Sequence, residues 1–156
     1  MPDRGPANPV VAPPPTAPNP DFERMAREQF EAQPFMRHVG AQLISISPGR
    51  CEMHLPYRPE LTQQNGFFHG GLIASLADNA GGAAGYSLLP PDRIALTVEF
   101  KVNIMAPGKG DLLIARGQVV RAGKTLTVCR ADVFSVSGGQ EKACATCLMT
   151  LMSIPR

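Results

Sequence analysis

One long helical segment lies in the interior of this chain, and it restricts the possible folds more than any other feature. Residues 70–88 contain no proline, and they are followed by Pro90 and Pro91, which end a helix. The segments around this helix alternate apolar and polar residues over short runs bounded by turn-forming residues, as β-strands do. The strand candidates are residues 41–47, 51–56, 96–105, 111–121, 125–136 and 142–152.

The strands that come after the helix follow one another without a further helix between them. Parallel strands need a long crossover connection, usually a helix, so these strands should pair as antiparallel neighbours. Residues 41–47 and 51–56 flank a Ser-Pro-Gly-Arg turn and should form a hairpin. Because a lone helix must bury its apolar face against the sheet, we expect an α+β fold with an antiparallel sheet wrapped around one long central helix.

The beginning of the chain differs in composition from the remainder. Half of the chain's 16 prolines fall within residues 1–20, which predicts an extended, flexible arm. This arm lacks the basic and apolar regions of a signal peptide. Asp21 and the spacing of Phe22, Met25 and Phe30 predict a short amphipathic helix over residues 21–33, with Asp21 as its N-cap. We therefore expect an arm, residues 1–20, followed by a single domain, residues 21–156.

Composition argues against several classes of function. A formal charge of +2 gives no reason to expect nucleic-acid binding, and no apolar run is long enough to span a membrane. The four cysteines do not have the spacing of a disulfide framework, which favours a cytoplasmic protein. Cys144 and Cys147 lie in an apolar strand candidate without a second pair, so we interpret them as buried structural thiols. We expect neither a metal nor a cofactor.

Asp78 is the only charged residue of the central helix. Its neighbours at helical spacing are all small, namely Gly71, Ala74, Ser75, Gly81, Gly82 and Gly85. An internal helix glycine costs about 1 kcal/mol relative to alanine, so something should offset this cost. Either Asp78 faces water and the glycines allow the helix to pack on the sheet, or the carboxylate lies in a narrow groove that receives a ligand. A solvated helix face usually carries several long charged side chains, so we favour the groove.

The start of this helix can stabilise negative charge. The first backbone N–H groups of a helix lack intrahelical partners, and Gly70 and Gly71 leave them sterically open to a developing oxyanion. Eight helical residues rise about 12 Å, so Gly70 and Asp78 of one chain cannot contact the same carbonyl. If both act on one substrate, they come from two copies of the chain, with two antiparallel helices across a two-fold axis. The sequence therefore predicts a homodimer.

Three motifs together resemble the hotdog-fold thioesterases of the PaaI type. The first is Gln63-x-Asn65-Gly-Phe-Phe-His-Gly-Gly, the second is Asp78-Asn-Ala, and the third is Val-Glu-Phe-Lys-Val-Asn ahead of Pro-Gly-Lys-Gly at residues 107–110. The resemblance covers residues 35–152. It implies a hotdog fold, hydrolysis of acyl-CoA thioesters and an active site shared between subunits that form a dimer or a homotetramer.

The resemblance also implies roles for individual residues. Asp78 activates water or attacks the thioester directly, while the Gly70 N–H of the partner subunit polarises the carbonyl. A side-chain amide beside that donor corresponds to Gln63, with Asn65 as a competing candidate. His69 is expected to fix its loop more than to carry protons.

Further candidates are Thr97, Gly71 and Phe68, and two basic residues. Thr97 matches a hydroxyl residue that assists water, although strand alternation places it on the polar face of its strand. We expect Gly71 and Phe68 in the substrate site, and Arg121 and Lys124 near the phosphates of CoA, together with Lys109. An apolar acyl pocket is expected from Phe67, Phe68, Tyr86, Leu88 and Leu89.

The expected function is hydrolysis of an acyl- or aryl-CoA to the free acid and CoA. Two alternatives remain at this point: a hotdog hydratase or dehydratase that pairs His69 with Asp78, and a non-enzymatic acyl-CoA-binding module. The sequence leaves the acyl group unidentified and does not separate a base from a nucleophile at Asp78.

Overall fold

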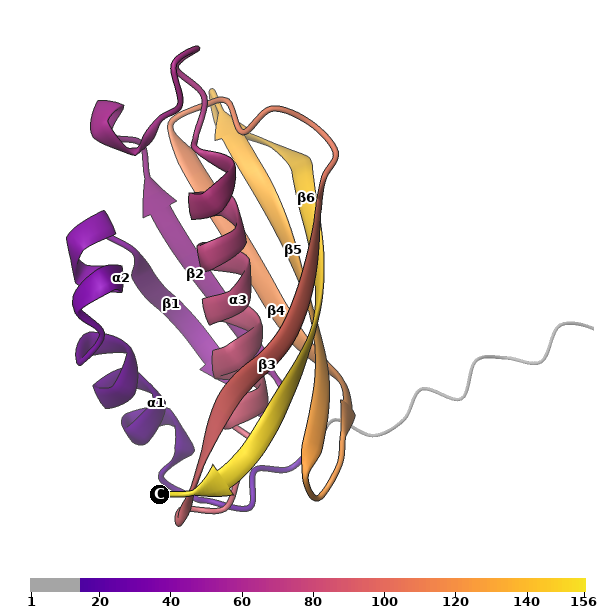
Figure 1. Ribbon diagram of the computed structural model, residues 1–156. Helices are drawn as coiled ribbons and strands as arrows, with labels where there is room; N and C mark the ends of the chain where they lie inside the picture. The colour runs from indigo at the N-terminus through magenta and orange to yellow at the C-terminus, as the bar shows by residue number, and fades with distance from the viewer. Residues whose placement is uncertain (1–14) are drawn as a thin grey trace, which may run out of the picture.

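The computed structural model describes residues 15–156, so most of the predicted arm, residues 1–14, lies outside the described part. Two short helices come first, and a six-stranded sheet and one long helix follow (Figure 1). The elements are α1 (Phe22–Glu31), α2 (Pro34–Val39), β1 (Gln42–Ser47), β2 (Arg50–Pro56), a 3-10 turn (Pro59–Leu61), α3 (Gly70–Tyr86), β3 (Arg93–Ile104), β4 (Leu112–Ala122), β5 (Leu126–Ser137) and β6 (Gln140–Pro155). Among these residues, no helix combines the length and apolar character needed to cross a lipid bilayer.

The sheet is antiparallel throughout and curves around α3. Its strands follow the order β1-β2-β4-β5-β6-β3, and each neighbouring pair is antiparallel. The long helix lies in the concave face, with β3 passing across its front edge (Figure 1). The predicted α+β architecture, with an antiparallel sheet around one central helix, is confirmed.

The core lies between α3 and the concave face of the sheet, and glycines allow the two layers to approach closely. A Cβ on Gly81 would lie 2.4 Å from the Sδ of Met149, and a Cβ on Gly85 would lie 2.3 Å from the Cδ1 of Leu151. On the sheet side, a Cβ on Gly117 would lie 2.2 Å from the backbone oxygen of Ala80. Gly81 and Gly85 therefore serve helix-to-sheet packing, as the first interpretation of the glycines proposed.

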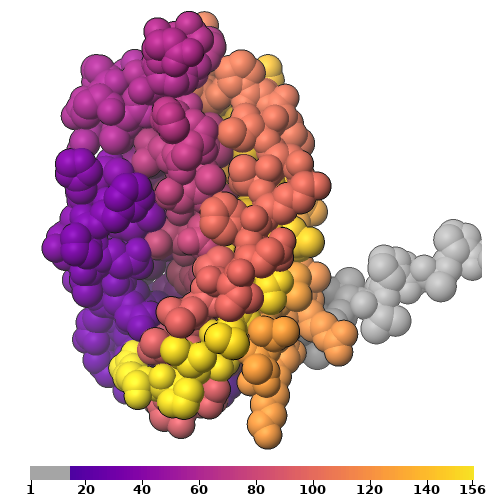
Figure 2. Space-filling model, viewed as in Figure 1, coloured from indigo at the N-terminus to yellow at the C-terminus, as the bar shows by residue number. Residues whose placement is uncertain are grey.

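Two helices, α1 and α2, cover the flank of the molecule beside β1 (Figures 1 and 2). A single helix over residues 21–33 was predicted, but α1 ends at Glu31 and α2 begins at Pro34, where proline suits the first helical turn. Asp21 occupies the predicted N-cap position, but its side chain makes no capping hydrogen bond. Its Oδ2 instead contacts Arg24 at 3.4 Å, and its own N–H donates to the Oδ1 of Asn19.

The cysteine thiols are all buried and none is in a disulfide, in agreement with their interpretation as structural. Burial raises the pKa of the Cys51 and Cys129 thiols to about 12, which keeps them protonated and unreactive at neutral pH.

Candidate active site

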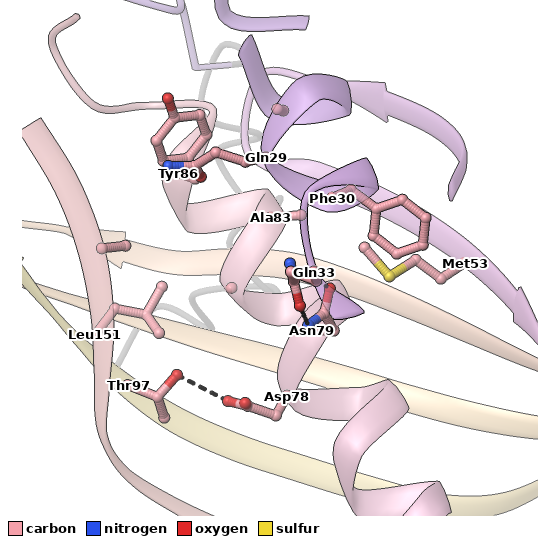
Figure 3. A pocket seen from close by; sticks show the side chains of 13 residues that line it. Gln29, Phe30, Gln33, Met53, Asp78, Asn79, Ala83, Tyr86, Thr97 and Leu151 are labelled. Carbon is pink, nitrogen blue, oxygen red and sulfur yellow. Dashed lines mark hydrogen bonds between the residues drawn. The ribbon is translucent and has the colours of Figure 1, made fainter. Parts of the chain in front are cut away.

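Asp78 lies in the middle of α3, half-buried, with its side chain directed at β3. The Thr97 hydroxyl donates to the Asp78 Oδ1 at 2.8 Å (Figure 3). Burial raises the pKa of the Asp78 carboxyl above its ordinary value, and the hydrogen bond from Thr97 lowers it in part. A partly desolvated carboxylate of this kind is a stronger base than an exposed one, and it is held in a fixed orientation.

Thr97 reaches Asp78 because β3 contains a bulge. Thr97 pairs with Leu151, and the regular register resumes at Glu99, which leaves Val98 as the extra residue. Paired residues of antiparallel strands point to the same face, and Leu151 packs beneath α3. Thr97 therefore also faces α3. The prediction that simple strand alternation decides the face of Thr97 is wrong, because the bulge resets the alternation at this point.

Asp78 borders a cavity of about 150 Å³ between α1, α3 and the sheet (Figure 3). Its walls are formed by Ala26, Gln29, Phe30 and Gln33 from the N-terminal segment, by Asp78, Asn79, Gly82, Ala83 and Tyr86 from α3, and by Met53, Ala95, Thr97 and Leu151 from the sheet. In the space-filling view, a hollow separates the N-terminal helices from the centre of the molecule (Figure 2). The carboxylate is thus accessible to a small ligand.

Gln33 and Asn79 also line this cavity, and the sequence predicted no role for either side chain. The Asn79 Nδ2 donates to the Gln33 Oε1 at 2.7 Å, and the Gln33 Nε2 donates to the Asn79 Oδ1 at 3.4 Å. This reciprocal amide pair joins the segment between α1 and α2 to the central helix. The two residues are 46 positions apart in the chain, so no local pattern could have paired them.

His69 caps the start of α3. Its Nδ1 accepts a hydrogen bond from the Gly71 N–H at 3.0 Å, which agrees with the expected loop-fixing role. The Gly71 N–H, expected in the substrate site, is therefore already engaged. The Gly70 N–H makes no hydrogen bond within residues 15–156, and a Cβ on Gly70 would lie 3.0 Å from the Cδ1 of Ile104. Gly70 thus offers the first free donor of the helix.

Gln63 lies beside Gly70. Both residues line a cavity of about 490 Å³ at the start of α3, whereas Asn65 is exposed and is not part of its lining. The Gln63 Oε1 accepts from the Asn65 N–H, which leaves the Gln63 Nε2 available to a ligand. Phe68 reaches the cavity but is only 2% exposed and makes an edge-on contact with Tyr57 at 5.6 Å between ring centroids. Phe68 is therefore mainly a core residue.

The basic residues expected near CoA occupy two different ends of the molecule. Lys109 lies in the loop between β3 and β4, next to the start of α3. Arg121 and Lys124 lie at and beyond the far end of β4, which is joined through Gly49 to Ser87 at the end of α3. These residues cannot contact one phosphate group within a single protomer.

The expected apolar pocket is likewise divided. Phe67 and Phe68 line the cavity at the start of α3, whereas Tyr86 lines the cavity beside Asp78. The 17 residues of α3 span about 25 Å, so the five apolar residues do not form one pocket. Within one protomer, the two cavities therefore share none of the residues predicted to form the apolar pocket.

The fold has counterparts among known proteins. The family model of the Thioesterase superfamily matches residues 65–142, and the chain belongs to this superfamily. A putative esterase of Halobacterium salinarum is 37% identical over 118 residues, which cover 72% of this chain and 78% of the relative. Human acyl-coenzyme A thioesterase 13 is 29% identical, over 76% of this chain and 86% of the relative.

Solved structures of other proteins show the same fold. The crystal structure of a thioesterase family protein from Silicibacter pomeroyi is 40% identical, with a TM-score of 0.85, and covers 86% of this chain and 99% of that chain. The E. coli PaaI protein shares the fold, with a TM-score of 0.76 at 24% identity over 86% of this chain and 94% of that chain. The hotdog fold, the resemblance to PaaI-type proteins and the assignment as a thioester hydrolase are confirmed.

Proposed function

We propose that this protein hydrolyses an acyl-CoA thioester to the free acid and CoA, with each active site built from two protomers. The observation that carries the proposal is the Asp78 carboxylate, held by Thr97 at the edge of a cavity that a ligand can enter. The relative acyl-coenzyme A thioesterase 13 supports CoA as the thiol component.

In the proposed mechanism, the thioester carbonyl accepts hydrogen bonds from the Gly70 N–H and the Gln63 Nε2 of one protomer. Asp78 of the other protomer takes a proton from a water molecule, whose oxygen bonds to the carbonyl carbon. Collapse of the tetrahedral intermediate breaks the C–S bond, and the proton held by Asp78 passes to the leaving sulfur. Thr97 keeps the carboxylate ionised and oriented while water approaches.

The requirement for two protomers follows from distance and from surface character. Gly70 and Asp78 are separated by about 12 Å along α3, which is too far for one carbonyl. The edge strand β3 and the residue after it expose large apolar side chains, namely Leu96, Val98, Phe100, Ile104 and Met105. An exposed apolar edge strand is a surface that pairs with another chain. A second copy of β3 would cover it and place two α3 helices antiparallel.

This antiparallel arrangement also brings the basic residues together. The partner's α3 starts beside Asp78 and extends back towards the start of the first α3. Lys109 of the partner subunit would then lie on the same side of the thioester as Arg121 and Lys124 of the protomer that supplies Asp78. We propose that these residues contact the phosphates of CoA. Replacing Arg121 and Lys124 with alanine should raise KM for an acyl-CoA but leave KM for the matching acyl-pantetheine unchanged.

The decisive test is thiol release from a panel of acyl-CoAs by the wild-type protein and by Asp78→Asn. Loss of a general base reduces turnover by about 10²–10⁴-fold, and we expect such a loss with CoA binding retained.

A single turnover in ¹⁸O-water should place the label in the product acid. Label in Asp78 would show that the carboxylate attacks directly, and unchanged turnover in Asp78→Asn would refute its role. Hydration of an enoyl-CoA without thiol release would favour the hydratase alternative.

A further inference from the structure

The cavity beside Asp78 has a wall that comes from outside the residues matched by the thioesterase family model. The match covers residues 65–142, whereas Ala26, Gln29, Phe30 and Gln33 belong to the N-terminal segment. Figure 3 shows α1 lying over the cavity, with Gln33 directed at Asn79 and the Asp78 carboxylate at the opposite side. The N-terminal helix therefore helps to determine what fits next to the catalytic carboxylate.

Gly82 is the α3 glycine that packing does not explain. Gly81 and Gly85 each meet a side chain of β6, so a larger residue there would clash. A Cβ on Gly82 would have no heavy atom within 4 Å, although Gly82 lines the cavity one turn after Asp78. Glycine destabilises a helix interior relative to alanine, and no packing contact at this position offsets that loss. The open space beside Gly82 is the space that a ligand would occupy.

The size of the cavity limits the ligand. Its volume is about 150 Å³. A cavity of about 150 Å³ in another protein holds one benzene molecule, so a single ring or a short branched chain would fill this one. The Gln33 and Asn79 amides satisfy each other, so the wall does not present these polar groups unpaired to an apolar ligand.

We propose that this cavity receives the acyl group of the thioester and that Gly82 sets the upper limit on its size, at about one aromatic ring. The inference rests on the proposed thioesterase function. A side chain at position 82 would project into the space of the acyl group next to the carbon attacked by water, and Phe30 on α1 also lines this space. Gly82 is thus a residue that determines specificity, at the expense of helix stability.

The test compares hydrolysis of acetyl-CoA, benzoyl-CoA and 2-naphthoyl-CoA by the wild-type protein, Gly82→Ala and Phe30→Ala. Discrimination by one methylene in an apolar pocket is about 10–200-fold. Gly82→Ala should lower the ratio of kcat/KM for benzoyl-CoA to that for acetyl-CoA by at least about tenfold. Its Tm should rise, because alanine replaces an internal helix glycine. Phe30→Ala should raise the ratio for naphthoyl-CoA over benzoyl-CoA.

Phe35→Ala is the matched control, because Phe35 on α2 is exposed and does not line the cavity, so both ratios should stay at their wild-type values. Equal losses on all three substrates in Gly82→Ala, or unchanged ratios in both cavity variants, would overturn the inference. A lower Tm in Gly82→Ala would also overturn it, since Gly82 would then serve packing. If the wild-type protein releases no thiol from any acyl-CoA, the proposed function itself fails.

Discussion

At the scale of single residues, two opposing effects set the chemistry of Asp78. Partial burial disfavours the charged carboxylate and raises its pKa, while the Thr97 hydroxyl stabilises the charged form. The first effect makes the carboxylate a better proton acceptor, and the second limits the pH range over which it would be protonated and inactive. The two residues therefore act as one unit, although 19 positions separate them in the chain.

Thr97→Val tests this balance. The substitution removes a hydrogen bond that stabilises the charged carboxylate. The pKa of Asp78 should therefore rise further. In the proposed mechanism activity depends on the ionised carboxylate, so the acidic limb of kcat/KM against pH should move to higher pH. Thr150→Val is the matched control, since Thr150 bonds to Glu99 and does not contact Asp78. An unmoved limb in Thr97→Val would contradict the balance.

At the scale of elements, the position of α3 depends on close contact with β4. A Cβ on Gly117 would lie 2.2 Å from the oxygen and 2.4 Å from the carbonyl carbon of Ala80, and neither backbone atom can turn aside. Helix and strand thus touch backbone to backbone at the level of the active site. This contact fixes how deeply α3 lies in the sheet, and hence the distance from Asp78 to Thr97.

Gly117→Ala should therefore destabilise the fold by about 1–3 kcal/mol, the usual cost of overpacking a core. Equilibrium unfolding in urea measures this change. Gly82→Ala is the informative comparison, because the same substitution in open space should stabilise α3 by up to about 1 kcal/mol. If the two substitutions changed the free energy of unfolding in the same direction, the packing roles assigned to these glycines would be wrong.

At the scale of the whole molecule, one protomer holds the two parts of the proposed active site too far apart for one substrate. The proposed oxyanion donors lie at the start of α3, and the carboxylate lies about 12 Å along the same helix. The exposed apolar side chains of β3 lie on the edge strand of the sheet, where a second chain can pair. Both features are explained if the functional unit is a dimer.

A heterodimer tests this arrangement directly. An Asp78→Asn chain and a Gln63→Ala chain, co-expressed with different affinity tags and purified together, should contain one intact site of two. Activity should return to about half that of the wild type, while each parent homodimer is defective. A heterodimer of an Asp78→Asn chain and a Thr97→Val chain should recover no activity, because Asp78 and Thr97 act from the same protomer. A Gln63→Ala heterodimer no more active than its parents would argue for a site within one protomer.

The sequence by itself determined the elements and their order. Alternating strands, glycine-containing turns and a proline-terminated helix are local patterns, and local patterns define local conformation, so the α+β architecture followed from them. The lone carboxylate of the helix and the glycines at its start were visible for the same reason. Spacing along the helix was enough to predict that Gly70 and Asp78 come from two copies of the chain if both act on one substrate.

Only the tertiary structure decided how these residues meet. The bulge at Val98 turns Thr97 towards Asp78 against the strand's own alternation, because register depends on the pairing of β3 with β6. Three glycines of α3 look equivalent in the sequence, but their surroundings differ. Gly81 and Gly85 face side chains of the sheet, whereas Gly82 faces open space. The wall formed by α1 and the Gln33–Asn79 pair arises from segments far apart in the chain. Such contacts depend on how distant surfaces fit together, and a pattern of neighbouring residues does not encode that fit.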